Sequence, residues 1–364
     1  MSVVSTFGQR AAAIRTCPIN PNHWYVVAQS SELTDQPLSV VLWHENIVLY
    51  RDRQGQVQGL EDCCPHRQVK LSEGQIVGDH LECIYHGWQF NRQGECAFIP
   101  YLAENQKLPT CQLRTYPVKE QDGFIWLYPG DQELLATKSL NPLSLPEWSH
   151  LNYIASVATI DCQGHFSFLI ENLMDMYHGH LHDSYQAWAS ANLTQIQADS
   201  ERIDAYYDAQ SYYKIDRIWS ISQLFFPALR KLHPEPLTVS YLYPHWYSTL
   251  GNDFKIYCLF CPISETQTRA YLVHFTSLNA FPKLHKLPIA FRQFLKDKLF
   301  GSARKMLEGL IRQDVIMIEQ EQEYYSKNPQ HRSYEVNPTL GKVQSLIRQQ
   351  AQAAIPVSDS LEQS

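Results

Sequence analysis

The stretch CCPHRQVKLSEGQIVGDHLECIYHGWQF, residues 63–90, carries two pairs of cysteine and histidine. Cys64 and His66 form a Cys-x-His pair, and Cys83 and His86 form a Cys-x-x-His pair. Two thiolates and two imidazoles can hold a tetrahedral zinc ion. The same four groups can hold a [2Fe–2S] cluster, with both cysteines on one iron and both histidines on the other.

The residues next to the two pairs favour the cluster over zinc. Pro65 lies inside the first pair and Gly87 follows the second, so each pair lies in a loop with a rigid or small residue beside it. Two such loops can close over a cluster from opposite sides and direct backbone N–H groups toward its sulfur atoms. We therefore interpret residues 63–90 as a cluster-binding segment.

The sequence on either side of this segment reads as short β-strands. Between Trp24 and Tyr128, β-branched and aromatic residues recur in short runs bounded by turn residues. These runs are SVVLWHE (39–45), NIVLYRD (46–52), VQGLEDC (57–63) and GFIWLYP (123–129). The pattern predicts a compact all-β unit.

A second folded unit follows the first. The segment DQELLATKSLNPLSLPEWSH, which ends at His150, has no regular period and reads as a linker. Beyond it, helix-like stretches at 165–188 and 290–326 flank strand-like ones, which predicts an α+β unit with an antiparallel sheet. The predicted division is 22–131 for the first domain, 132–150 for the linker, 151–350 for the second domain and 351–364 for a disordered tail.

Composition excludes several classes of function. A net charge of −7 with a pI near 6.1 and no long basic stripe argues against nucleic acid as a partner. No run of about 18 uncharged apolar residues is present, and the N-terminal residues lack the apolar stretch of a secretory signal. The nine cysteines are irregularly spaced, which is poor support for a disulfide framework. We expect a reducing, cytoplasmic setting.

A second group of potential ligands lies in ENLMDMYHGHLH, residues 171–182. The run favours helix, and at about 100° per residue Asp175, His178 and His182 share one face while His180 points away. Two histidines four residues apart on a helix are typical of a metal site. The alternative is a polar helix face with a chance pair of histidines.

The cysteine and histidine motif resembles the Rieske signature. Together with residues 171–182 it resembles the large (alpha) subunits of Rieske non-haem iron oxygenases, from NHWYVVA at residue 22 to about residue 326. The resemblance implies an N-terminal all-β Rieske [2Fe–2S] domain followed by a helix-grip catalytic domain with a mononuclear Fe(II). One departure is Gln68, because a small residue commonly follows the arginine of CPHR in this family.

The resemblance also implies roles for individual residues. The family's mononuclear motif matches Asn172, Asp175, His178 and His182. Two histidines of that motif and one carboxylate from a late helix hold the iron. In RQDVIMIEQEQEYY (312–325) the best match to that carboxylate is Asp314, and Glu319 and Glu321 are the alternatives.

Two further roles concern the path of electrons. In the family, the aspartate at the position of Asp175 links a Rieske histidine of a neighbouring subunit, here His86 or His66, to a histidine of the iron site, here His178. Transfer between subunits implies a head-to-tail ring, commonly a trimer. Asn172 would lie near the open iron positions.

Electrons have to come from another protein, because the chain contains no G-x-G-x-x-G fingerprint of a flavin or nicotinamide site. A separate reductase, a ferredoxin or both are implied. The basic stretch KLHKLPIAFRQFLKDKLFGSARK, residues 283–305, could dock an acidic ferredoxin or contact an anionic membrane peripherally. It could also be a solvated helix packed over the sheet.

The expected function is an oxygenase that uses O₂ to hydroxylate or oxidatively demethylate a mostly apolar aromatic, polycyclic or alkaloid-like substrate. The same metal chemistry serves monooxygenation, dioxygenation and demethylation, so the sequence leaves the reaction open. One alternative is a Rieske electron-transfer protein with a ligand-binding second domain and no oxygenase activity. Another is a binding module stabilised by zinc.

Overall fold

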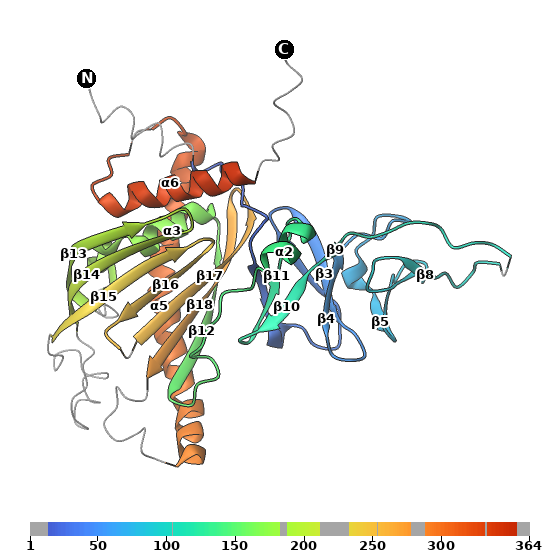
Figure 1. The fold of residues 1–364 in the computed structure, drawn as a ribbon, viewed down its shortest axis with the longest axis horizontal. Coiled ribbons are helices and arrows are strands. Elements are labelled where there is room, and N and C mark those ends of the chain that lie inside the picture. The colour runs from blue at the N-terminus through green and yellow to red at the C-terminus, as the bar shows by residue number, and fades with distance from the viewer. Residues whose placement is uncertain are drawn as a thin grey trace. The chain divides into compact units, whose positions relative to one another are not determined.

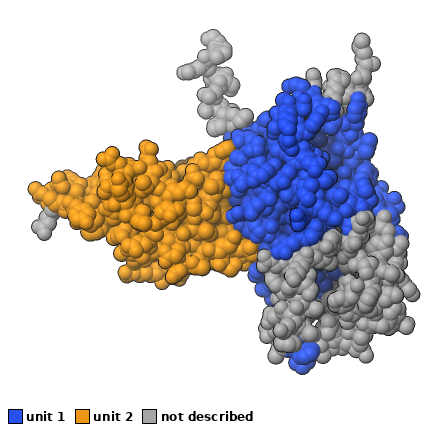
Figure 2. Space-filling model, turned by 180° about the vertical axis from the view of Figure 1, so that it is seen from behind, with its two compact units in different colours: residues 1–19, 146–364 blue, residues 20–145 orange. Residues whose placement is uncertain are grey.

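The computed structural model describes residues 14–103, 105–182, 188–211, 233–252, 254–277, 288–331 and 333–354. The chain forms two compact units, coloured separately in Figure 2. Residues 20–145 make the N-terminal unit, and residues up to Ile19 together with those from Pro146 make the C-terminal unit. Within the described residues, no helix is long and apolar enough to cross a membrane.

The N-terminal unit is built from short antiparallel strands, which confirms the expected all-β architecture (Figure 1). The strands form three small sheets with the orders β1-β11-β10, β2-β3-β4-β9 and β5-β6-β7-β8. They comprise β1 (Tyr25–Gln29), β2 (Leu38–Leu42), β3 (Glu45–Arg51), β4 (Val57–Glu61), β5 (Gln75–Val77), β6 (His80–Glu82), β7 (Gln89–Phe90), β8 (Cys96–Phe98), β9 (Thr115–Tyr116), β10 (Val118–Gln121) and β11 (Phe124–Leu127).

The core of the N-terminal unit comes from strands that are covered on both faces. All four residues of β11 are buried, and four consecutive residues of β3, from Ile47 to Tyr50, are fully buried. Val48 and Tyr50 of β3 belong to an apolar cluster that also includes Cys64 and Cys83. The two predicted cysteine ligands are therefore held by packing rather than by flexible surface loops.

The segment 132–150, predicted as a linker without a regular period, contains a short helix. Helix α2 (Gln132–Lys138) begins at Asp131, whose carboxylate accepts hydrogen bonds from the backbone N–H groups of Glu133 and Leu134 at 2.8 and 3.4 Å. Aspartate is a favoured residue at this capping position. The residues that follow are mostly good helix formers.

The C-terminal unit has one large antiparallel sheet and several helices, as expected for an α+β unit (Figure 1). The strand order is β12-β18-β17-β16-β15-β14-β13. The strands are β12 (Tyr153–Cys162), β13 (Trp188–Ala198), β14 (Arg202–Ser211), β15 (His233–Leu242), β16 (His245–Leu250), β17 (Phe254–Ser264) and β18 (Gln267–Ser277). The helical elements are α3 (Phe166–Met174), the 3-10 helix η3 (Met176–His182), α5 (Ile289–Lys327) and α6 (Pro338–Ala353).

At strand β12, one face of this sheet packs against α5. Cys162 at the end of β12 approaches Glu319 of α5, and the burial of its thiol raises the pKa of Cys162 to about 12. Because side chains alternate along a strand, Ala158 lies on the same face as Cys162. The unbroken register from β12 to β14 extends that face through a row of paired residues: Ala158, Leu272, Cys258, Trp246, Tyr241 and Ile203.

Some expected elements differ in the structure. The strand-like run LTVSYLYPHWYSTL (237–250) contains parts of two strands, because β15 and β16 form a hairpin with a turn at Tyr243 and Pro244. Residues 283–287 of the basic stretch lie outside the described residues, and the rest of that stretch leads into and forms the first part of α5. Of the predicted tail, residues 351–353 belong to α6 and residues 355–364 lie outside the described residues.

The first described residues of the chain attach to α3. The Arg15 guanidinium lies 3.6 Å from the centre of the Phe168 ring and donates to Ser167 Oγ at 2.7 Å. It also forms an ion pair with Glu171, whose side chain is almost completely buried. Removing Arg15 would leave this buried carboxylate without its ion-pair partner, which would strongly destabilise the folded protein. This segment is thus a structural part of the C-terminal unit.

The start of α3 depends on His165, which is fully buried. Its Nδ1 accepts a hydrogen bond from the Ser167 backbone N–H at 3.2 Å, and its Nε2 lies 3.1 Å from the carbonyl oxygen of Cys17. Burial lowers the pKa of His165 to about 4. The imidazole is therefore neutral in the folded protein at neutral pH.

This burial predicts a pH dependence of stability. In the unfolded chain His165 protonates near its ordinary pKa of 6.5, so between about pH 6.5 and 4 only the unfolded state binds the proton. The free energy of unfolding should fall as pH decreases through that range, by about 3 kcal/mol for the full shift. The variant His165→Asn keeps a good helix cap but cannot titrate.

The measurement is urea unfolding, followed by circular dichroism at a helical wavelength, at neutral pH and at about pH 4.5. Wild-type protein should lose about 2 to 3 kcal/mol more stability than His165→Asn over this interval. Equal losses in the two proteins would show that His165 does not carry the dependence.

Candidate metal centres

The two loops with the predicted cluster ligands share one backbone frame. In each loop the cysteine N–H donates to the carbonyl five residues later, and its own carbonyl accepts from the N–H four residues later. These bonds are Cys64 to Val69 (2.8 Å) and Gln68 to Cys64 (2.8 Å) in the first loop, and Cys83 to Trp88 (2.8 Å) and Gly87 to Cys83 (3.0 Å) in the second.

The equivalent position in both loops has a left-handed backbone. Gln68 has φ of +57° and Gly87 has φ of +68°. This conformation costs a residue with a side chain roughly 1–2 kcal/mol, whereas glycine adopts it freely. The structure therefore gives a physical reason for the small residue that the family commonly has where this chain has Gln68.

The structure brings all four predicted cluster ligands together. The thiols of Cys64 and Cys83 are buried and in contact with each other. The ring centres of His66 and His86 are 4.5 Å apart. His66 also stacks on Trp88, with 4.7 Å between ring centres and 7° between ring planes.

The chemistry of this group fits a [2Fe–2S] cluster. Burial and the neighbouring Cys83 thiol raise the pKa of Cys64 to about 12, while the backbone N–H groups of His66 and Arg67 act in the opposite direction. His66 Nδ1 is buried and has no hydrogen-bond partner. Iron ions would supply the positive charge that keeps the sulfurs as thiolates and would bind the free nitrogen.

A second group of ligands meets between η3 and α5. His178, His182 and Asp314 offer one ligand atom each, and within the described residues these atoms lie within 4.8 Å of one another. The distances to Asp314 Oδ1 are 3.6 Å from His178 Nε2 and 3.4 Å from His182 Nε2. All three side chains are largely buried.

The surroundings of this group fit a divalent metal ion. His182 Nδ1 lies 3.1 Å from Gln313 Oε1, which orients the ring so that Nε2 faces the other two groups. Burial raises the pKa of Asp314 and lowers that of His178. The protein alone therefore supplies too little positive charge to balance the charge of the Asp314 carboxylate. Asn172 Nδ2 donates to Asp314 Oδ1 at 3.4 Å. Two imidazoles and one carboxylate are the ligand set of non-haem Fe(II) oxygenases.

The local backbone of residues 171–182 differs from the expected helix. Helix α3 ends at Met174, Asp175 is extended (φ −96°, ψ 104°), and η3 follows as a 3-10 helix. The Asp175 carboxylate accepts a hydrogen bond from the Tyr177 N–H at 3.0 Å, a local bond that competes with a continuous helix. His180 is exposed, so it is turned away from the other two histidines as expected.

Comparison with known proteins now adds to this geometry. The model of the Rieske [2Fe-2S] domain matches residues 23–117. The 4beta-methylsterol monooxygenase of Methylococcus capsulatus is 30% identical over 347 residues, which are 93% of this chain and 90% of that protein. The chain belongs to the family of Rieske non-haem iron oxygenase alpha subunits.

One further relative of this Rieske oxygenase matches a smaller part of its sequence, and a solved structure shares its fold. The oxygenase component of dicamba O-demethylase from Stenotrophomonas maltophilia is 34% identical over 162 residues, 43% of this chain and 45% of that protein. The crystal structure of dicamba monooxygenase bound to dicamba has the same fold, with a TM-score of 0.73 and 21% identity over 93% of this chain and 99% of that one.

Family membership identifies the chain as an oxidoreductase that uses O₂. It carries a Rieske [2Fe–2S] cluster and a mononuclear iron. Cys64, His66, Cys83 and His86 would hold the cluster, which would supply single electrons, and His178, His182 and Asp314 would hold the iron, which would supply the site for O₂ chemistry. A reductase or ferredoxin supplies the electrons. The zinc module and the electron carrier without oxygenase activity are therefore excluded as descriptions of this chain.

Asp175 lies next to the iron site of this Rieske oxygenase. Its carboxylate accepts from Asn337 Nδ2 at 2.8 Å as well as from Tyr177. The hydrogen bond of His178 goes to the Asp175 backbone. The sequence did not single out Asn337, although the pair Asn337 and Pro338 is a common start of a helix and marks the beginning of α6.

The two alternative carboxylates lie outside the group of three ligands. Glu319 Oε1 accepts a hydrogen bond from the Gln163 backbone N–H at 2.9 Å, where α5 meets the end of β12. Burial raises the pKa of Glu321, and the nearby Arg15 partly offsets this effect. Within the described residues, only Asp314 meets the two histidines.

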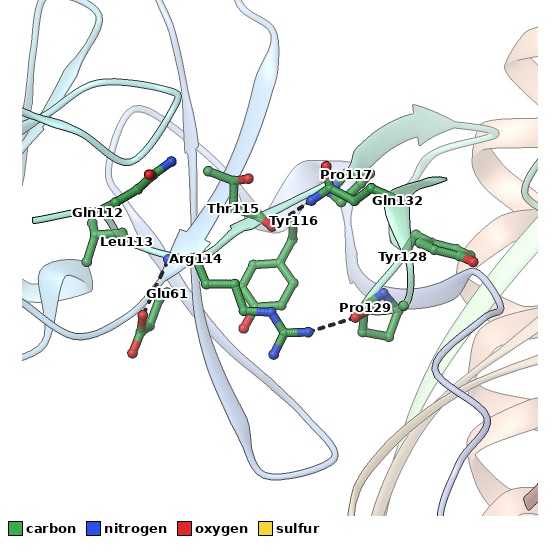
Figure 3. A pocket seen from close by; sticks show the side chains of 11 residues that line it. Glu61, Gln112, Leu113, Arg114, Thr115, Tyr116, Pro117, Tyr128, Pro129 and Gln132 are labelled. Atoms are coloured by element: carbon green, nitrogen blue, oxygen red, sulfur yellow. Dashed lines mark hydrogen bonds between the residues drawn. The ribbon is translucent and has the colours of Figure 1, made fainter. Parts of the chain in front are cut away.

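A pocket of about 490 Å³ lies elsewhere in the N-terminal unit and contains none of the predicted ligands. Figure 3 shows Arg114 at its centre, with the backbone N–H near Glu61 and the guanidinium donating to the carbonyl of Pro129 at 2.8 Å. The polar lining is already engaged within the protein, so we assign this pocket no role.

Gly87 offers a direct test of the second cluster loop. A Cβ at this position would lie 2.8 Å from Pro100 Cγ in addition to the strained φ. The variant Gly87→Ala should therefore lose about 2–3 kcal/mol of stability and bind less cluster. Gly55→Ala is a matched control, because Gly55 has φ of +77° but nothing within 4 Å of the added atom.

The two variants are compared by thermal unfolding and by the Rieske visible absorption per protein. Gly55→Ala should keep the full cluster and lose about 1 kcal/mol, from backbone strain alone. Equal cluster content and equal stability in the two variants would contradict the packing of Pro100 against this loop.

Proposed function

We propose that each of the two groups of ligands binds the cofactor its chemistry fits. The Rieske cluster is bound by Cys64, His66, Cys83 and His86, and the mononuclear Fe(II) by His178, His182 and Asp314. The support is the convergence of buried donor atoms in two places and the unpartnered nitrogen of His66. Asn172, which donates to Asp314, adjusts the carboxylate ligand and lies beside the iron.

We propose further that the substrate is a mostly apolar polycyclic compound, hydroxylated on a methyl group. The observation that carries this proposal is the likeness to a methylsterol monooxygenase over 93% of the chain, including the catalytic part. The sequence match to dicamba O-demethylase covers only 43% of the chain, and the solved structure of dicamba monooxygenase, at 21% identity, shares the fold. Oxidative demethylation follows from the same step when the methyl group is attached to oxygen or nitrogen.

The face of the large sheet that packs against α5 is suited to such a substrate. Its row of paired residues includes the buried apolar side chains of Ala158, Ile203 and Leu272. The same row contains Tyr241 and Trp246, whose hydroxyl and indole N–H are buried without a hydrogen-bond partner. An apolar ligand with one or two oxygen atoms would satisfy these groups and exclude water.

The substrate proposal is tested with purified oxygenase, a general ferredoxin and ferredoxin reductase, and ¹⁸O₂. A methylated sterol and an O-methylated aromatic acid of the dicamba type are offered together. We expect the sterol to gain an ¹⁸O-labelled hydroxyl group and the aromatic acid to remain unchanged. Demethylation of the aromatic acid with an unchanged sterol would overturn the substrate class but not the enzyme class.

We also propose that Asp175 carries electrons between neighbouring subunits, which requires a closed head-to-tail ring, as in a homotrimer. The Asp175 carboxylate is held at 2.8 Å by Asn337, so it is fixed in position for such a role. Light scattering after size-exclusion chromatography should give three times the 42.2 kDa of one chain. A monomer that turns over at the full rate would contradict this arrangement.

We also propose a cytoplasmic location for the protein and a docking role for the basic stretch 283–305. None of the nine cysteines forms a disulfide, which suits a reducing, cytoplasmic setting.

The stretch 283–305 would dock an acidic ferredoxin or lie on an anionic membrane. Neutralising Lys296 and Lys298 should then slow reduction by ferredoxin or weaken binding to anionic vesicles. If both stay unchanged, the stretch is a solvated helix.

A further inference from the structure

Two cysteines outside the cluster face each other at the base of an excursion of the chain. Glu95 pairs with Gln112 in an antiparallel bridge, and the Leu113 N–H donates to the Gly94 carbonyl at 2.8 Å. Continuing this register by one residue places Cys96 opposite Cys111. Residues 97–110 form a loop that begins and ends at this pair and is called the excursion below.

The geometry suits a disulfide. Directly opposed residues of antiparallel strands have Cα atoms about 4.5–5.5 Å apart, within the range of about 4.4–6.8 Å that disulfides span. The thiols of Cys96 and Cys111 are neighbours, and burial, followed by the nearby Cys111, raises the pKa of Cys96 to about 11. Cys96 is 8% exposed, whereas Cys111 is only partly buried.

The excursion packs against the parts of the protein that hold the cluster. Ile99 packs against the apolar cluster that includes Cys64 and Cys83. Pro100 lies so close to Gly87, the residue after His86, that a Cβ there would be 2.8 Å from Pro100 Cγ. A covalent link across the base of 97–110 would therefore restrain the segment that covers the second cluster loop.

We propose that Cys96 and Cys111 form a reversible dithiol–disulfide site, oxidised by small disulfides such as oxidised glutathione, and that the bond holds residues 97–110 against the second cluster loop. This site is separate from the oxygenase reaction. It uses two thiols that neither the cluster nor the mononuclear iron requires.

The chemistry proceeds by two exchanges. The more exposed Cys111, as a thiolate, attacks one sulfur of oxidised glutathione, forms a mixed disulfide and releases one glutathione. Cys96, as a thiolate, then attacks the Cys111 sulfur, forms the Cys96–Cys111 bond and releases the second glutathione. Two electrons pass from the cysteine pair to oxidised glutathione, and the two thiol protons end on the released glutathione molecules.

The experiment treats the loaded, full-length protein with oxidised glutathione without oxygen, blocks the remaining thiols, and maps disulfides by mass spectrometry. Wild-type protein should yield a Cys96–Cys111 linked peptide. Cys63→Ser is the matched control, because Cys63 is another partly buried thiol of the same unit, and it should yield the same link. Cys96→Ser should stop at a mixed disulfide on Cys111, and Cys111→Ser should yield no link.

The restraint is measured by the rate at which trypsin cuts after the exposed Lys107, inside the excursion. Oxidation should slow this cut several-fold in wild type and in Cys63→Ser, and not in Cys96→Ser. Cys96→Ala serves as a second variant, and the visible Rieske spectrum verifies that each protein keeps its cluster. The proposal is overturned if wild type stays reduced or stops at the mixed disulfide. An unchanged cutting rate in linked protein would overturn the restraint.

Discussion

Replacing Asp314 with asparagine is expected to abolish substrate oxidation and to remove the mononuclear iron, while the Rieske electron paramagnetic resonance signal remains. Asp314 is the carboxylate that meets His178 and His182, and an amide is a weaker, neutral ligand for Fe(II). Loss of a residue that only supports a ligand typically costs 10- to 100-fold, so loss of the carboxylate itself should cost at least about 100-fold in turnover.

The measurements are total iron, acid-labile sulfide and product formation for each variant. Three irons and two sulfides per chain should become about two and two in Asp314→Asn, as the cofactor content of this family requires. His178→Ala should behave in the same way. Retained iron with retained turnover in Asp314→Asn would remove Asp314 from the site.

Two neighbouring acids provide matched controls on the same helix. Glu319→Gln keeps an oxygen that can accept from the Gln163 N–H, and Glu321→Gln removes a buried charge without touching the two histidines. Both variants should keep the mononuclear iron and most of the activity. If Glu319→Gln or Glu321→Gln lost the iron instead, the third ligand would be reassigned to that residue.

Replacing Asp175 with asparagine is expected to slow electron transfer from the reduced cluster to the iron site by 10- to 100-fold, with both metals still bound. Asp175 follows α3, and its carboxylate accepts hydrogen bonds from Asn337 and from the Tyr177 N–H. Its backbone is hydrogen-bonded to the ring of His178. The amide has a similar shape but lacks the negative charge. Reoxidation of the cluster in a single turnover with substrate and O₂ measures the rate.

Asn337 allows the position of Asp175 to be changed without changing its charge. Asn337 caps α6 through its side-chain oxygen, which accepts from the Thr339 N–H at 3.0 Å, and holds Asp175 through its side-chain nitrogen. Asn337→Ser keeps a favourable cap and removes the amide donor to Asp175, whereas Asn337→Ala removes both the cap and the donor and should cost about 1 kcal/mol of stability.

The outcomes of these variants separate the effect of the negative charge of Asp175 from the effect of its position. Asn337→Ser should slow the transfer less than Asp175→Asn and should unfold at the wild-type temperature. A normal transfer rate in Asp175→Asn would contradict the electron-bridge role. A slow rate in Asp175→Asn with a normal rate in Asn337→Ser would show that the carboxylate does not need Asn337.

The sequence could identify the ligands because each lies in a short motif with a chemical meaning. The Cys-x-His and Cys-x-x-His pairs require no knowledge of distant contacts, and the family motif separates His178 and His182 from His180. Asp314 was harder, because a single acid on a long helix is ordinary, and only the resemblance selected it. The fold then brought it to within 3.4 Å of His182.

Features that depend on distant contacts could not be predicted. Helical periodicity extended the helix through Asp175, but the bonds to Tyr177 and Asn337, which is far along the chain, favour a break there. The pairing of β15 with β16 across Tyr243 and Pro244 is likewise set by contacts between the two strands. The common frame of the two cluster loops is set by backbone hydrogen bonds, which leave little trace in residue identity.

The attachment of Arg15 to α3 has a consequence for synthesis of the protein. Residues up to Ile19 belong with those from Pro146 onward, so the whole N-terminal unit is inserted in the chain between two parts of the other unit. On the ribosome, Arg15 emerges long before Ser167 and Glu171, and the N-terminal unit is complete before either residue is made. Arg15 must therefore stay accessible through the synthesis of an entire domain before it can neutralise the carboxylate that it will help to bury.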